Sequence, residues 1–165
     1  MSSSGESLQR SNASAAGAHF SSALPRTAFD ADVLIYAAVH GHPLGKRVAA
    51  LFSNGDSTAG VASVLLLSEV LAKPMRDDPE SQEVAALLSL LSRLDLRPLD
   101  EATARLALVL AGSYRLRAAD AAHLATAISA GATRFLTNNR KDFPESITEI
   151  DIVYPEELPD PIAAD

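Results

Sequence analysis

Two carboxylates interrupt an apolar stretch near the beginning of the chain. Asp30 and Asp32 stand two residues apart in the segment FDADVLIY, residues 29–36. If this segment is a buried strand, its period of two places both carboxylates on the same side. Like charges this close repel each other unless a metal ion, a proton or a basic side chain relieves them. The rest of the chain must show which of these three relieves the repulsion between the two acids.

Three further carboxylates are candidates for the same site. Glu69 shares a helix face with Leu65 and Leu66, so it points toward the apolar side of its helix. Asp120 stands among alanines, which leave room for an ion and a substrate, and Asp142 ends a polar turn. Ordinary interpretations stay open: an acid beside an apolar stripe for Glu69, a favourable helix-dipole position for Asp120, and a solvated turn for Asp142.

The elements that must position these residues alternate between strand and helix patterns. Strands are predicted at residues 28–36, 58–62, 94–97, 134–137 and 150–154. Helices are predicted from Pro43, from a Ser63 cap to about Lys73 before Pro74, near Pro79, after an Asp100 cap, and from Ala118 to Ala130 before Gly131. This alternation favours a parallel α/β sheet covered by helices on both faces. Functional sites in such sheets form at the carboxyl ends of the strands.

Composition limits the chemistry that is available. The chain has 165 residues, 47% of them hydrophobic, and no long unbroken apolar run, so we expect one domain and no membrane span. The absence of cysteine excludes disulfides and thiolate zinc sites, and it is compatible with the reducing cytoplasm in which we place the protein. The net charge of -7 argues against binding nucleic acid by bulk electrostatics. A local basic rim is still open, formed by Arg115, Arg117, Arg134, Arg140 and Lys141.

The two ends of the chain differ from the centre. Residues 1–22 are rich in serine, alanine and glycine and have little to bury, which is typical of a disordered tail or leader. They lack the basic start and apolar core of a secretory signal. Residues 23–158 form the predicted domain, and residues 159–165 are expected to be a frayed terminus.

Four segments together resemble the PIN-domain nucleases, and most closely the VapC-type toxins of toxin–antitoxin pairs. They are FDADVLIY at 29–36, SVLLLSEVLAKP at 63–74, ADAAHLATA at 119–127 and GATRFLTNNRKDF at 131–143. All four occur in the family's order and spacing, and the resemblance covers about residues 26–158. It implies a PIN-like three-layer α/β/α fold with a central, mostly parallel sheet of about four to five strands.

The resemblance also assigns roles to individual residues. It makes Asp30 the first acidic metal ligand, Glu69 the second and Asp120 the third. Asn139 stands where many members of the family have an acid, and Asp142 is the residue that could replace that ligand. In supporting positions, Asp32 departs from the family's usual Asn, Thr or Ser and adds charge or fixes the turn, while Thr137 hydrogen-bonds a carboxylate or a metal-bound water.

Such a set of oxygen ligands suits Mg²⁺ or Mn²⁺. A bound divalent ion would activate water and neutralise charge during RNA phosphodiester hydrolysis, and without it the clustered carboxylates should be partly protonated. The resemblance implies a toxic endoribonuclease with an RNA substrate, a cognate antitoxin protein as its partner, and a homodimer. No histidine is required, so His123 is expected on a helix surface, with a role as partner of a metal ligand or as a substrate contact as the alternative. His40 and His42 are expected in an exposed loop.

Two alternatives remain at this point. The departure at Asn139 is compatible with a non-catalytic PIN-like module that binds RNA. Asp30-Ala-Asp32 also resembles the first motif of haloacid-dehalogenase-type phosphatases, in which the two acids are nucleophile and general acid. Against the phosphatase, Leu34 stands where those enzymes usually have Thr or Val, and the surroundings of Asp120 supply no late pair of acids.

Overall fold

The structure is a computed structural model that describes residues 25–55 and 57–161. The predicted tail at residues 1–22 therefore lies outside the described residues, as does the end of the chain after residue 161. Near that end, Leu158 is buried, and Nη1 of Arg47 donates to its carbonyl oxygen over 2.7 Å. None of the described helices is long and apolar enough to cross a membrane.

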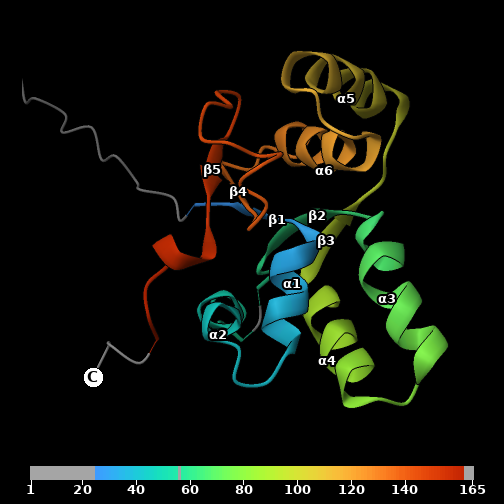
Figure 1. Ribbon diagram of the computed structural model, residues 1–165, viewed down its shortest axis with the longest axis vertical. Helices are drawn as coiled ribbons and strands as arrows, with labels where there is room; N and C mark the ends of the chain where they lie inside the picture. The colour runs from blue at the N-terminus through green and yellow to red at the C-terminus, as the bar shows by residue number, and fades with distance from the viewer. Residues whose placement is uncertain (1–24, 56, 162–165) are drawn as a thin grey trace, which may run out of the picture.

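Five parallel strands form the central sheet in the order β3-β2-β1-β4-β5 (Figure 1). They are β1 (Thr27–Phe29), β2 (Gly60–Ser63), β3 (Leu94–Arg97), β4 (Arg134–Leu136) and β5 (Asp151–Val153). The all-parallel sheet confirms the predicted fold class. Because β1 is central, the residue that follows it lies between the ends of β2 and β4.

Helices cover both faces of the sheet (Figure 1). On one face lie α1 (Ala31–Ala38), α2 (Pro43–Ala50), α3 (Leu66–Asp77) and α4 (Gln82–Leu91), and on the other α5 (Glu101–Tyr114) and α6 (Ala118–Ser129). A short 3-10 helix, η1 (Pro155–Glu157), follows β5. The predicted three-layer α/β/α arrangement is therefore confirmed.

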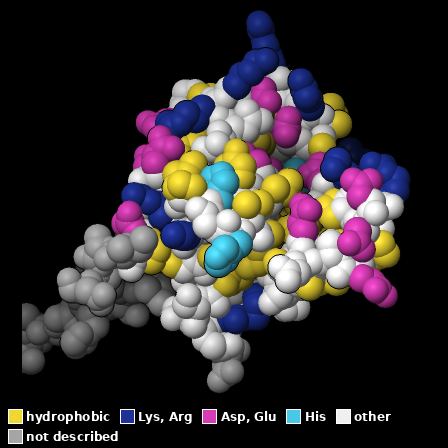
Figure 2. Space-filling view, turned by 60° about the horizontal axis from the view of Figure 1, so that its bottom comes forward, with side chains coloured by type: hydrophobic (Ala, Val, Ile, Leu, Met, Phe, Trp, Pro, Cys, Tyr) yellow, Lys and Arg dark blue, Asp and Glu magenta, His cyan; other side chains and the backbone are white. Residues whose placement is uncertain are grey.

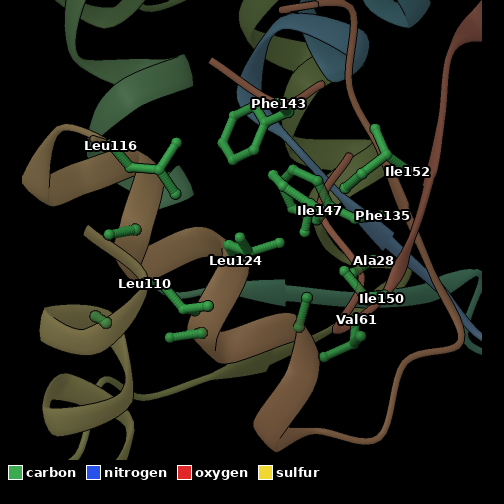
Figure 3. Packing of buried hydrophobic residues seen from close by; sticks show 14 of the residues in the cluster. Ala28, Val61, Leu110, Leu116, Leu124, Phe135, Phe143, Ile147, Ile150 and Ile152 are labelled. Carbon is green, nitrogen blue, oxygen red and sulfur yellow. The ribbon is translucent and has the colours of Figure 1, made fainter. Parts of the chain in front are cut away.

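Alternate strand residues divide the core into two clusters. Ala28 packs in the cluster beneath α5 and α6, whereas the next residue, Phe29, packs in the cluster beneath the other four helices. Figure 3 shows the first cluster, in which Leu110 and Leu124 approach the sheet from the helical side. Burial on both faces explains why the inner strands β1 and β2 carry no charged residue, whereas the edge strand β3 alternates between leucine and charged residues.

The predicted strand at residues 28–36 is wrong beyond Phe29. Asp30 is the N-cap of α1, and its Oδ1 accepts a hydrogen bond of 2.8 Å from the N–H of Ala31. Val33 and Leu34 are then buried on the inner side of a helix. A short apolar run fits a buried strand and a buried helix equally well, and here the preference of aspartate for the N-cap decides between them.

The predicted end of α3 at about Lys73, with Pro74 as the stop, is also wrong. The helix includes Pro74 and ends at Asp77, after which the N–H of Asp78 donates to the Pro74 carbonyl over 2.9 Å. A proline near a helix end removes one N–H from the hydrogen-bond ladder without preventing a last turn. The predicted Ser63 cap is replaced by a hydrogen bond from the N–H of Leu65 to Oγ of Ser63, and α3 starts one residue later.

Candidate functional site

Asp30 is held rigidly at the carboxyl end of β1. Its side chain is 6% exposed, and its second oxygen, Oδ2, accepts a hydrogen bond of 2.7 Å from the hydroxyl of Thr137. Thr137 is completely buried and follows β4 directly, so the two neighbouring strands fix both partners. The expected hydrogen bond from Thr137 to a carboxylate is therefore present.

Asp32 joins α1 to the loop after β4. Its Oδ2 accepts a hydrogen bond of 3.0 Å from the N–H of Asn138, which gives this acid the role of fixing the turn. Its Oδ1 is buried and has no hydrogen-bond partner among the residues that the structure describes. Burial, followed by the charge of Asp30, raises the pKa of Asp32 to about 7. At neutral pH this carboxyl is thus close to its titration midpoint.

Glu69 reaches the site from the first turn of α3 and binds a histidine. Its Oε2 lies 2.7 Å from Nε2 of His123 on α6, and the histidine side chain is 2% exposed. The expectation that His123 lies on a helix surface is therefore wrong. Residues 121–127 of α6 are all buried because α5 covers this helix on the side away from the sheet. The lack of charged residues in that stretch was the sequence signal for a buried helix.

Asp120 lies in the first turn of α6 and is half-buried. Burial raises its pKa, the charges of Asp30 and Asp142 raise it further, and His123 and Arg117 lower it. The pKa of Asp30 is likewise raised chiefly by burial, and the charge of Glu69 adds to this effect. The four acids therefore act on one another electrostatically, although they come from four separate parts of the chain.

Asn139 and Asp142 form a reciprocal pair in the loop after β4. Nδ2 of Asn139 donates to Oδ2 of Asp142 over 2.8 Å, and the N–H of Asp142 donates to Oδ1 of Asn139 over 3.2 Å. The N–H of the buried Phe143 also donates to the Asn139 carbonyl. Asn139 thus orients the neighbouring acid, a role that its spacing in the sequence did not reveal.

The model of the PIN-domain family matches residues 28–145, a stretch that includes every acid described above. The chain belongs to the PIN-domain family. A search of curated proteins found no match. The phosphatase interpretation of Asp30 and Asp32 is set aside, because both residues belong to the PIN domain.

Solved structures share the fold of this PIN domain. A toxin–antitoxin complex from Klebsiella pneumoniae matches at 22% identity and a TM-score of 0.60, over 79% of this chain and 97% of the other. DNA-bound VapBC from Salmonella typhimurium matches at 19% identity and a TM-score of 0.64, over 80% and 99% of the two chains. VapBC2 from Rickettsia felis, bound to a fragment of its promoter DNA, matches at 17% identity and a TM-score of 0.61, over 78% and 97%.

The acids of this PIN domain fit a hard divalent cation by their chemistry. Within the described part of the chain, no three acidic or imidazole side chains are arranged as a ready metal-binding group. Glu69 is instead paired with His123, and Asp30 with Thr137. The donors are nevertheless carboxylate oxygens, whose repulsion a cation would relieve. Figure 2 shows acidic side chains gathered around a hollow in the surface, with a histidine visible inside it.

The expected basic rim is only partly correct. Arg134 begins β4, and its Nε donates to the hydroxyl of Thr27 at the start of β1. It therefore lies at the amino ends of the strands, whereas Asp30 follows the carboxyl end of β1. Arg140 is paired with Glu156. Arg115, Arg117 and Lys141 are exposed.

Proposed function

We propose that this PIN domain is a metal-dependent endoribonuclease that hydrolyses RNA phosphodiester bonds with Mg²⁺ or Mn²⁺. The observation that carries the proposal is the position of Asp30. It is buried at the end of the central strand, and it interacts electrostatically with Glu69 and Asp120 from two other elements. Membership of the PIN-domain family supports the same conclusion.

The proposed ligands are Asp30, Glu69, Asp120 and Asp142. Thr137 and the N–H of Ala31 hold one oxygen each of Asp30, so this carboxylate cannot turn away from the site. His123 orients Glu69, and Asn139 orients Asp142. When bound, a divalent ion lowers the pKa of a water molecule and neutralises charge that develops on the phosphate. The protein's own contribution is to keep several acids close together and oriented, at the cost of the repulsion between them.

A cleavage assay tests this proposal. Wild-type protein should cut single-stranded RNA in Mg²⁺ or Mn²⁺ and lose this activity in EDTA. Asp30→Asn should lower the rate by more than about 100-fold, because residues that merely support metal ligands already contribute about 10- to 100-fold. Asp95→Asn is a matched control, since Asp95 is a partly exposed acid of β3 that pairs with Arg26 and Arg97.

A second candidate is a non-catalytic module that binds RNA. The hydrogen bond from Asn139 favours it, because an amide replaces the acid that many PIN domains have at this position and occupies an oxygen of Asp142. Calorimetry with Mn²⁺ separates the two candidates. Binding of Mn²⁺ that Asp30→Asn abolishes supports the nuclease, and RNA binding without any Mn²⁺ binding supports the module.

We further propose that the protein acts in the cytoplasm as the toxin of a type II toxin–antitoxin pair, as a homodimer held by a cognate antitoxin. The support is that three solved structures with this fold are described as toxin–antitoxin or VapBC complexes. Expression of the chain alone should arrest growth, and Asp30→Asn should relieve the arrest. Unimpaired growth with soluble, folded wild-type protein would contradict the toxin assignment.

A further inference from the structure

Two aromatic rings stack beside the acidic site. Tyr36 belongs to α1, and His42 is the N-cap residue of α2. Their ring centroids are 4.4 Å apart and their planes differ by 9°, and both residues are partly exposed. The two rings are therefore stacked face to face at the turn between the helices, and only the outer face of each ring is left for a further stacking partner.

The chain holds this ring pair rigidly. Nδ1 of His42 accepts a hydrogen bond of 3.1 Å from the N–H of Gly45, which fixes the imidazole against the start of α2. A Cβ atom at Gly45 would lie 2.0 Å from the Tyr36 carbonyl oxygen, so only glycine allows the two helices to approach this closely. The N–H of His42 also donates to the Val39 carbonyl. His42 was expected as a free loop residue, and its role as a cap corrects that expectation.

Hydrogen bonds connect the ring pair to the proposed metal site. Tyr36 lies one turn after Asp32 on the same face of α1. The side-chain amide of Asn138 donates to the Tyr36 hydroxyl over 3.2 Å, and the N–H of Asn138 donates to Asp32. Through Asn138 the ring pair is thus connected to Asp32, which stands two residues after the proposed ligand Asp30.

Most other aromatic rings in the described residues are not accessible in this way. Phe29, Phe52, Phe135, Phe143 and Tyr154 are buried. Tyr114, the last residue of α5, is partly exposed, but its hydroxyl donates a hydrogen bond to the Glu149 carboxylate. Among the described residues, Tyr36 and His42 are therefore the stacked pair of rings that is partly open to solvent.

We propose that the Tyr36–His42 pair stacks against a base of single-stranded RNA and positions the adjoining phosphodiester at the acids. This inference rests on the proposed ribonuclease function. Aromatic side chains bind single strands by stacking on base faces, which every base has, and such contacts suit a protein whose net charge of -7 gives little general attraction for phosphate. The pair is a positioning element and takes no part in bond cleavage.

Binding should be measured in the Asp30→Asn protein, so that cleavage does not disturb the readout. The probes are oligoadenylate, oligouridylate and an oligoadenylate with 2-aminopurine, whose fluorescence falls when the base stacks. The protein should quench 2-aminopurine and prefer oligoadenylate, since adenine stacks more strongly than uracil. Adding Tyr36→Leu or His42→Asn should reduce this preference about fivefold or more and abolish the quenching.

Two controls isolate the role of the rings. Asparagine is a good N-cap residue, so His42→Asn removes the ring while the cap of α2 is kept. Tyr36→Phe keeps the ring and loses only the hydrogen bond to Asn138, and Tyr114→Leu removes a ring away from the site, so both should bind like the parent. Circular dichroism confirms that each variant is folded.

The results separate this inference from the proposed function. Absence of quenching in the Asp30→Asn parent, or unchanged quenching in the folded His42→Asn variant, would overturn the stacking role even if the wild-type protein cleaves RNA. Quenching that depends on both rings, in a protein whose wild type does not cleave RNA, would support the stacking role and overturn the nuclease.

Discussion

The hydroxyl of Thr137 donates a hydrogen bond of 2.7 Å to Oδ2 of Asp30, joining the residues that follow two adjacent parallel strands. Thr137→Val keeps the shape of the side chain but removes this bond and the one that the hydroxyl accepts from the N–H of Asn139 over 3.0 Å. We expect RNA cleavage to fall about 10- to 100-fold, as is typical when the partner of a metal ligand is lost. Thr137→Ser keeps a hydroxyl and should retain most of the activity. Equal activity of the valine and serine variants would show that the bond does not orient Asp30 for cleavage.

Asp32 should make the metal-free protein less stable as the pH rises. Its pKa is about 7 in the folded protein and 3.8 ordinarily, so the folded state holds its proton more tightly. The resulting stabilisation is complete below the ordinary value and is lost as the pH rises through about 7. Melting curves in EDTA should therefore show a decline across this range that is shallower in Asp32→Asn.

A suitable control for Asp32 is Asp100→Asn at the exposed N-cap of α5. Hydrogen bonds from Thr103 lower the pKa of Asp100, so its contribution is lost only as the pH falls. This variant should leave the decline toward neutral pH unchanged. A decline of equal slope in the wild type and Asp32→Asn would show that Asp32 keeps an ordinary pKa.

Metal ions should stabilise the fold more at neutral than at acidic pH. Burial and neighbouring charges raise the pKa of Asp30 and of Asp120, and protons compete with metal for these oxygens. The increase in melting temperature caused by Mn²⁺ should therefore be larger at about pH 7.5 than at about pH 5.5. Asp120→Asn should reduce the increase at the higher pH. An increase that is independent of pH and of Asp120 would indicate binding elsewhere.

The contact between His123 and Glu69 should matter for activity beyond its effect on stability. His123→Leu fills a similar buried volume but removes the group that lies 2.7 Å from Glu69. We expect cleavage to fall about 10- to 100-fold in a protein that still folds. His123→Gln can still hydrogen-bond Glu69 and should retain more activity than the leucine variant. The reverse order of activities would contradict an orienting role.

Asn139→Asp should have opposite effects with and without metal. The change replaces the amide that donates to Asp142 with a second carboxylate, so the two side chains repel each other in EDTA and the melting temperature falls. A bound cation relieves that repulsion, and the stabilisation by Mn²⁺ should exceed that of the wild type. A smaller metal effect in Asn139→Asp would show that this loop does not face the ion.

Sequence patterns predicted the layers of the fold because burial on both faces leaves a clear signal. The strand around Phe135 is a short apolar run, and the helix after Asp100 begins at the expected cap, with Oδ1 of Asp100 accepting from the N–H of Thr103. The boundary after Phe29 was missed because the apolar residues after Asp32 suit a strand as well as a helix.

The candidate acids were recognisable from their types and their place after predicted strands, whereas the contacts that orient them were not. His123 touches Glu69 across 54 positions of the chain, and the uncharged stretch of α6 indicates burial without showing which residue His123 meets. The hydrogen bonds between Asn139 and Asp142 depend on the exact loop conformation. Thr137 was foreseen as a carboxylate partner only through the family resemblance.

The most direct test of the account is the cleavage rate of Asp30→Asn on RNA in Mg²⁺, measured beside wild type and Asp95→Asn. The variant keeps an N-cap side chain at the start of α1 and loses the charge that Thr137 orients. We expect the Asp30→Asn rate to fall by more than about 100-fold while Asp95→Asn cleaves like the wild type. Cleavage by Asp30→Asn at the wild-type rate would contradict the central claim that Asp30 organises the metal site.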